Sequence, residues 1–232
     1  MCSDEARNGK TLTARLLADN LLMTGRDPFV FDCDDPRGRI TRFYPERSRL
    51  LDIAKTSGQI RMFDAILAEP ARDYIIDLPA HGLDPFFTVV DDLDFINAAH
   101  DAGTELVISY VLDQTPTSVM TARDLRGAFS TESFYLIRNA WNANPLTKRQ
   151  VREVYEEIEP DAVFHLPLVD REAMSIAEEA TFSFFAFAEG RYGGLTPMVR
   201  LRLRSFLSEV MEQFQSKELS LDLGTLKQMG LI

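Results

Sequence analysis

The chain reads RNGKTLTARLLADNLLMTGRDPFVFDCDDP at residues 7–36, and this segment sets the architecture that we expect. It contains Gly-Lys-Thr at residues 9–11 and continues with leucines three and four residues apart, up to the Gly25 that ends the pattern. Leucines at that spacing share one face of a helix, so residues 10–24 are predicted to form an amphipathic helix. A short apolar run that ends in acids follows, and it predicts a buried strand directly after the helix.

The same alternation of segments continues along the chain. Runs rich in β-branched and aromatic residues predict strands at 28–33, 73–79, 105–112, 133–139 and 162–168. Apolar residues at helical spacing predict helices at 10–24, 59–69, 88–101, 116–128, 147–158, 171–180 and 197–215. This order predicts an α/β fold, with a doubly wound, mainly parallel sheet and helices on both faces. Such sheets bind ligands at the carboxyl ends of their strands.

Length and composition indicate one globular domain. The 232 residues are 45% hydrophobic, so we expect a single domain over 1–232, with 190–232 as a C-terminal helical extension. Two cysteines are too few for a disulfide framework, which favours a reduced, cytoplasmic location. Because no apolar run approaches the roughly 18 residues of a membrane span, none is predicted.

The charge of the chain bears on its partners. A formal net charge of −11 opposes binding to phosphate backbones and anionic lipids, so contact with DNA would need a local basic patch. The arginines that could form such a patch are Arg191, Arg200, Arg202 and Arg204. Clusters of this kind are more often solvated faces or parts of a partner-binding helix.

Gly9, Lys10 and Thr11 have the composition of the second half of a phosphate-binding loop. Such a loop needs glycine for its backbone path, a lysine for charge, a hydroxyl for magnesium and the N-terminus of a helix. Asp32 and Asp34 end the next strand and, at a spacing of two, are expected to point to the same side. The next apolar strand ends in Asp77, and carboxylates at neighbouring strand ends can position magnesium and water.

Together these motifs resemble the ParA/MinD group of deviant Walker A ATPases, which belong to the SIMIBI class of P-loop proteins. The matching motifs are Gly9-Lys10-Thr11, the helix-to-strand segment at 15–32, Asp32-Cys33-Asp34 and Asp77-Leu78-Pro79. The resemblance extends to two later segments, SFYLIRNAWN (133–142) and FHLPL (164–168). It implies a P-loop NTPase-like fold that binds ATP and Mg²⁺.

The resemblance also implies a role for each matching residue. Lys10 and Asp34 would be the catalytic residues, with Lys10 on the β- and γ-phosphates and Asp34 orienting the hydrolytic water. The implied magnesium ligands are Thr11, Asp32 and Asp77. The implied nucleotide-binding residues are Gly9, Lys10, Thr11, Asn139, which would contact the base, and Pro167, on the base side.

The start of the chain departs from the family pattern. Where the family has its signature lysine and two glycines, this sequence has Glu5, Ala6 and Arg7. A glutamate repels phosphate, and alanine or arginine is strained where a glycine loop has positive φ. The strand that precedes the loop is also missing, because residues 1–5 are neither long nor apolar enough to form it. Either an N-terminal segment is absent from this sequence, or the loop has decayed and binds nucleotide weakly or not at all.

The function implied by the resemblance is a nucleotide-dependent switch in plasmid or chromosome partitioning or positioning. It would hydrolyse ATP weakly, dimerise on nucleotide binding and act on a partition-type partner protein. One alternative is a nucleotide-dependent ligase of the dethiobiotin-synthetase or cobyrinate-synthase type, for which the sequence offers no clear set of substrate-binding cations. The other is an interaction module with a degenerate loop that binds no nucleotide.

Overall fold

A computed structural model of the chain describes residues 1–4, 6–113, 115–141 and 148–228; at 148–152 and 217–228 it describes only the backbone. The strands are β1 (Phe29–Asp32), β2 (Ser48–Leu50), β3 (Tyr74–Asp77), β4 (Val107–Leu112), β5 (Ser133–Asn139) and β6 (Ala162–Leu166). The helices are α1 (Lys10–Met23), α2 (Thr56–Ala68), α3 (Leu83–Asp92), α4 (Phe95–Asp101), α5 (Pro116–Ala128), α6 (Lys148–Ile158), α7 (Arg171–Ala177), α8 (Phe184–Ala188) and α9 (Pro197–Gln228), with a 3-10 turn, η1 (Ala80–Gly82).

The five predicted strands are confirmed, and β2 is an additional one. β2 has only three residues, Ser-Arg-Leu, and lies at the edge of its sheet, so it carries no apolar run that a sequence pattern could reveal. The single helix predicted at 88–101 is wrong, because the chain forms α3 and α4 there. The break lies at Asp94, whose φ of 51° is left-handed and cannot continue a right-handed helix.

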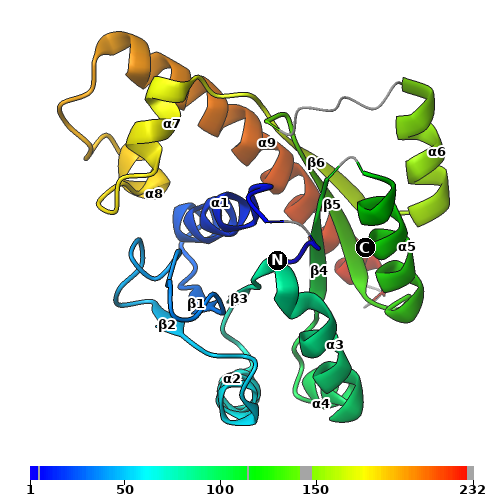
Figure 1. Cartoon of the computed structure of the whole chain (residues 1–232). Coiled ribbons are helices and arrows are strands. Elements are labelled where there is room, and N and C mark those ends of the chain that lie inside the picture. Colours follow the sequence, from blue (N-terminus) through cyan, green and yellow to red (C-terminus); the bar gives the residue numbers. More distant parts are fainter. Residues whose placement is uncertain (5, 114, 142–147, 229–232) are drawn as a thin grey trace.

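The fold is α/β, with parallel strands in two three-stranded sheets of order β2-β1-β3 and β4-β5-β6 (Figure 1). The first residues of the chain join them. The nitrogen of Met1 donates to the carbonyl of Ile76 at 2.7 Å, and the Met1 carbonyl accepts from Leu78 N–H at 3.1 Å. On the other side, Cys2 exchanges hydrogen bonds of 3.0 Å with Ser109 and Val111. Met1 and Cys2 therefore bridge the two sheets between β3 and β4.

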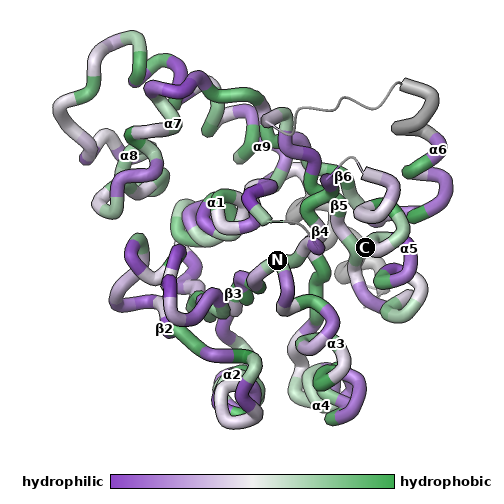
Figure 2. Tube along the Cα trace, in the orientation of Figure 1, coloured by the Kyte–Doolittle hydropathy of each residue, from purple (hydrophilic) through white to green (hydrophobic). Residues whose placement is uncertain are grey.

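Helices cover both faces of the strands. Apolar side chains of α2 to α6 pack on one face, and those of α1, α7, α8 and α9 pack on the other. The helices and strands thus form one apolar core on each face of the sheets. Adjacent strand residues alternate between these cores: Tyr110 and Leu136 belong to the core with α2 to α6, and Val111 and Ile137 belong to the core with α1, α7, α8 and α9. This explains why the strand segments are apolar at successive positions. Most of the segment around β2 is hydrophilic, as Figure 2 shows in purple.

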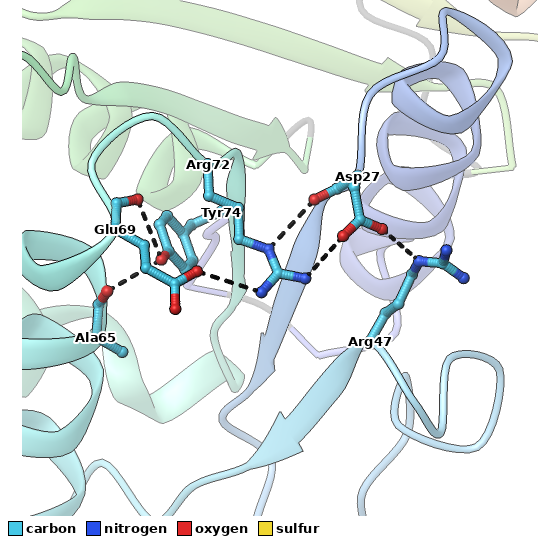
Figure 3. A network of polar contacts seen from close by, with 6 residues as sticks. All are labelled: Asp27, Arg47, Ala65, Glu69, Arg72 and Tyr74. Atoms are coloured by element: carbon cyan, nitrogen blue, oxygen red, sulfur yellow. Dashed lines mark hydrogen bonds and ion pairs between the residues drawn. The ribbon is translucent and has the colours of Figure 1, made fainter.

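A polar network closes the amino ends of β1 and β3, opposite the strand ends that the sequence singles out (Figure 3). Asp27 accepts from Arg47 Nε at 2.6 Å and pairs with Arg72 at 3.1 Å, while Tyr74 donates its hydroxyl to the Ala65 carbonyl at 3.0 Å. The hydrogen bond from Arg47 holds the pKa of Asp27 below its usual range. These contacts link β1, β3 and α2, although exposed ion pairs contribute little stability.

Among the helices that the structure describes, none is both long enough and apolar enough to cross a membrane.

Candidate functional site

Several of the sequence-predicted site residues lie close together, at the ends of β1, β3 and β5 and at the N-terminus of α1. Asp32 and Asp77 are aligned partners at the ends of neighbouring strands. The loop before α1 reaches the same edge, because Met1 and Cys2 lie between the two sheets. The parallel topology thus places the Gly-Lys-Thr tripeptide beside these carboxylates, as the sequence predicts.

Gly9 is the residue directly before α1, at its N-cap, and two features require it to be glycine. Its φ of 106° is left-handed, and a Cβ built on it would lie 2.4 Å from Nδ2 of Asn139. That amide in turn donates to the Asn8 carbonyl at 3.0 Å. Any larger residue at position 9 would therefore push Asn139 away from the loop.

Lys10, the first residue of α1, is buried, with only 8% of its surface exposed. Its Nζ donates to Oδ1 of Asn8 at 3.4 Å. Burial lowers the pKa of Lys10, and the nearby negative charge of Asp77 partly opposes that change. The site thus holds a desolvated cation at a helix N-terminus, where the helix dipole also favours an anion.

Thr11 ties α1 to the end of β3. Its hydroxyl donates to Oδ2 of Asp77 at 2.8 Å, while Oδ1 of Asp77 is buried and has no hydrogen-bond partner among the described residues. Burial raises the pKa of Asp77 to about 6, against the lowering effect of the Thr11 hydroxyl. A buried carboxylate oxygen without a donor is costly, and a cation bound there would relieve that cost.

Asp32 is fully buried and anchors the loop that follows it. Its Oδ2 accepts hydrogen bonds from Ile40 N–H at 2.8 Å and from both N–H and hydroxyl of Thr41 at 2.9 and 2.8 Å. Its Oδ1 accepts from Asp34 N–H at 3.2 Å. The sequence gives no sign of this anchoring role, because nothing in its local pattern indicates that residues 38–41 fold back onto Asp32.

Asp34 lies in the turn after β1, beyond the end of the strand at Asp32. Strand alternation therefore does not extend to it, and its carboxylate forms an ion pair with Arg39 Nε at 2.8 Å. Arg39 comes from the loop that Asp32 holds, and its charge contributes to the lowered pKa of Lys10. Arg39 is thus a second cation near the site, which the sequence motifs do not single out.

Asn139 is the last residue of β5, and Pro167 follows the end of the neighbouring strand, β6. Besides contacting Asn8, Asn139 accepts from Trp141 N–H at 3.1 Å, so its side chain buttresses the loop. Pro167 is half-buried directly after β6. Two large apolar side chains, Trp141 at 53% and Leu168 at 66%, are exposed two residues beyond the aligned ends of β5 and β6.

Two loop residues just before Gly9 also have defined conformations and contacts. Arg7 has a φ of 61°, so the chain takes a left-handed conformation there without glycine. Asn8 is buried and donates to Ser3 Oγ and, at 3.1 Å, to the Val111 carbonyl. Asn8 thereby links the loop to β4. The only sequence signal for this role is the position of Asn8 next to Gly9-Lys10-Thr11. Glu5 lies outside the described residues.

A metal site built from protein side chains alone does not form in the part of the chain that is described, where no three His, Cys, Asp or Glu residues cluster suitably. Thr11 and Asp77 nevertheless fit Mg²⁺, which is held in many proteins by one or two protein oxygens together with phosphate and water. The donor set fits a magnesium–nucleotide complex better than a free ion.

Comparison with known proteins does not identify a family for this chain. No protein-family model and no curated protein matches the chain. Among solved structures, it is similar to a nucleotide-binding protein from Archaeoglobus fulgidus, in complex with ADP and with cobalt present. The TM-score is 0.47 at 15% sequence identity, and the match covers 77% of this chain and 84% of that chain. A likeness this distant carries no argument about function.

Proposed function

We propose that this chain binds ATP with Mg²⁺ and that its nucleotide state controls association with itself or with a partner protein. The observation that carries the proposal is the contact of Thr11 with Asp77 at 2.8 Å, which leaves a buried carboxylate oxygen without a donor. The Thr11 hydroxyl lies in the first turn of α1, and the Asp77 carboxylate lies at the end of β3. A hydroxyl and a carboxylate placed in this way are the ligands that a protein supplies to a magnesium–phosphate complex.

In this proposal the phosphates lie at the N-terminus of α1. The N–H groups of its first turn have no partners within the helix, and the Lys10 ammonium lies beside them. Thr11 Oγ1 and Asp77 Oδ1 would hold the magnesium, which when bound would neutralise part of the phosphate charge. The charge of Asp77 already favours the protonated form of Lys10, and an arriving phosphate would add a second counter-charge to this desolvated cation.

The ion pair between Asp34 and Arg39 gives the site a means of switching. A terminal phosphate near Lys10 would compete with Asp34 for the guanidinium of Arg39, freeing the Asp34 carboxylate to orient water. Because the segment of Arg39 is anchored on Asp32, a change there would propagate through residues 34–41. Ordering of a loop by the terminal phosphate is a known way in which nucleotide state controls partner binding.

The base would lie toward β5 and β6. Trp141 and Leu168 are exposed apolar side chains beyond the ends of those strands, Asn139 contacts the loop through the Asn8 carbonyl, and Pro167 directly precedes Leu168. An aromatic side chain at that position can stack on a purine. Trp141 is the single tryptophan of the chain, so its fluorescence is a specific reporter of this side of the site.

Calorimetric titration with Mg-ATP tests the proposal. We expect wild type to bind, Lys10→Ala to lose at least tenfold in affinity, and Arg123→Ala, which removes an exposed cation on α5, to bind as wild type does. Trp141 fluorescence should change over the same concentration range. Equal binding by wild type and Lys10→Ala, or binding by neither, would contradict the proposal.

The switch requires a separate measurement. Light scattering or pull-down in the presence of a non-hydrolysable ATP analogue should give a larger assembly than ADP does. Arg39→Ala should reduce this difference while ATP still binds, because it removes the proposed phosphate-responsive partner of Asp34. The same assembly state with ATP analogue, ADP and no nucleotide would contradict the switch.

A further inference from the structure

A buried arginine on α1 contacts two segments that are far apart in the chain. Arg15 has only 3% of its surface exposed. Its Cζ lies 3.4 Å from the ring centre of Phe43, in the connection from β1 to β2, and 5.1 Å from that of Phe184, the first residue of α8. A planar guanidinium stacks on aromatic rings and is attracted to their faces. In Figure 1, both segments lie beside α1. One side chain thus holds both of them.

Hydrogen bonds around Arg15 reinforce these two contacts. On the α8 side, Nη2 of Arg15 donates to the Phe182 carbonyl at 3.3 Å. Asp19, one turn further along α1, accepts from Phe184 N–H at 2.8 Å. On the other side, Tyr44 donates its hydroxyl to the Arg15 carbonyl at 3.0 Å. The connection from β1 to β2 and the start of α8 are therefore attached to the same turn of α1.

The burial of Arg15 costs stability. Its Nε is buried and has no hydrogen-bond partner among the described residues. Desolvation lowers the pKa of Arg15 to about 10, although Tyr44 and Asp19 oppose this change. Replacing a buried charged side chain by an apolar one of similar volume is often neutral or stabilising. Stability alone therefore does not account for an arginine at this position, whereas a contact that joins two segments does.

The segment around Phe43 continues the loop at 34–41. Phe43 N–H donates to the Ile40 carbonyl at 2.9 Å, and Tyr44 N–H donates to the Thr41 carbonyl at 3.3 Å. Ile40 and Thr41 are also the residues whose N–H groups bind the carboxylate at the end of β1. Because these hydrogen bonds form one short turn, a displacement of residues 39–41 moves Phe43 against the guanidinium of Arg15.

We propose that Arg15 is the positioning residue through which the nucleotide-dependent change in the loop at 34–41 reaches α8. This inference rests on the proposed function, because the terminal phosphate supplies the change in the loop. Ordering of the loop presses Phe43 onto the guanidinium, which in turn fixes Phe182 and Phe184 at the start of α8. Residues 182–188 then differ between nucleotide states, although none of them belongs to the candidate phosphate site.

A double-mutant cycle tests the coupling in the nucleotide-free protein. Phe43→Leu and Phe184→Leu are made singly and together, and the equilibrium constant of unfolding is measured in urea. The effect of Phe184→Leu should be at least about threefold smaller when Phe43→Leu is present. This difference should vanish when all variants also carry Arg15→Met, which keeps a long apolar side chain in the core. Additive effects with the arginine present, or a coupling that survives Arg15→Met, would overturn the proposal.

Arg191→Met is the matched control. The guanidinium of Arg191 lies 5.1 Å from the ring centre of Phe185, also on α8, but its side chain is 58% exposed and is paired with Glu189. The cycle repeated with Arg191→Met should keep the coupling between Phe43 and Phe184, because Arg191 stacks on a different ring. A loss equal to that caused by Arg15→Met would overturn the specific role of Arg15.

Hydrogen exchange tests the transmission itself. With Mg²⁺ and a non-hydrolysable ATP analogue, exchange at the amides of residues 182–188 should slow at least about threefold in wild type and in Arg191→Met. It should not change in Arg15→Met or in Phe43→Leu, although calorimetry should show that both variants still bind the analogue. Two variants on either side of the contact keep the test decisive if one of them fails to fold.

The outcomes separate this proposal from the one on which it rests. Binding of the analogue by wild type without slower exchange at residues 182–188 would overturn the transmission alone. Slower exchange that persists in Arg15→Met or in Phe43→Leu would do the same. Absence of binding by wild type would overturn the proposed function, and the transmission with it.

Discussion

The Thr11 hydroxyl donates to Oδ2 of Asp77 at 2.8 Å, and this bond joins the first turn of α1 to the carboxyl end of β3. The other oxygen of Asp77 is buried without a hydrogen-bond partner among the residues described. A tightly packed helix start and strand end are therefore joined through a carboxylate that is only half satisfied. The unpaired oxygen of Asp77 is therefore available to a cation or to a hydrogen-bond donor.

Thr11→Val tests both parts of that contact. The substitution keeps the shape of the side chain but removes the donor, so Asp77 loses its hydroxyl partner. We expect the free energy of unfolding in urea to fall by about 1–3 kcal/mol. Thr11→Ser, which retains a hydroxyl, should recover most of it. We further expect Mg²⁺-dependent ATP binding to be lost in Thr11→Val and retained in Thr11→Ser; identical Mg²⁺ dependence in both variants would argue against a magnesium role.

Gly9→Ala tests the close approach of Asn139 to the loop. The new Cβ would lie 2.4 Å from Nδ2 of Asn139, in a residue whose φ is 106°. Gly25→Ala is the matched control, because Gly25 also has a positive φ, 81°, but nothing lies within 4 Å of its added Cβ. We expect the control to lose about 1–2 kcal/mol of stability from backbone strain alone.

Gly9→Ala should lose more than Gly25→Ala, by about 1 kcal/mol or more, because it also breaks the bond from Asn139 to the Asn8 carbonyl. Urea unfolding of the two variants in parallel measures the difference. If both lose the same amount, Asn139 does not hold the loop in the way that the structure describes.

The meeting of Thr11 with Asp77 was predictable from the sequence, and the reason is topological. The carboxyl ends of parallel strands share one edge, so an acid that ends a strand and the start of a helix that leads back into the same sheet come together. Apolar runs revealed those strands, and leucine spacing revealed α1. Strong local periodicity was therefore enough to predict these strands, α1 and the contact between Thr11 and Asp77.

The contacts that shape the rest of the site depend on segments without periodicity. Asp32 bonds to Ile40 and Thr41, in a polar loop whose return path has no local pattern. Two residues, Met1 and Cys2, are too short to indicate a strand, although they bridge both sheets. Their pairing is determined by the free edges of β3 and β4, which only the assembled structure reveals.

Asp32→Asn tests the anchoring of the loop at 34–41. The amide would replace one acceptor oxygen by a donor, so at least one of the hydrogen bonds from Ile40, Thr41 or Asp34 is lost. We expect trypsin to cleave after Arg37 or Arg39 at least tenfold faster than in wild type, since both arginines lie in that loop. Cleavage at Arg61, exposed on α2, is the internal control and should keep its rate. Unchanged cleavage at Arg37 and Arg39 would exclude an anchoring role for Asp32.

The buried carboxylate of Asp19, on α1, predicts a pH dependence of stability. Burial raises its pKa to about 6 from the ordinary 3.8, against the lowering effects of Arg15 and of the hydrogen bond from Phe184 N–H at 2.8 Å. Between those two pH values the native state holds a proton that the unfolded state has lost. Asp19 therefore makes the protein less stable as pH rises from about 4 to 6, by at most about 1.4 kcal/mol per pH unit.

Asp19→Asn keeps an acceptor for Phe184 N–H and removes the titration. Its unfolding free energy is measured in urea at half-unit steps from pH 4 to 8. As the pH rises from 4 to 6, this free energy should fall less steeply than that of wild type. The difference between the two curves should level off above pH 6, where Asp19 is ionised in both states. Asp64→Asn, which changes an exposed carboxylate on α2, is the control and should follow wild type. Parallel curves for wild type and Asp19→Asn would mean that Asp19 titrates alike in the folded and unfolded chain.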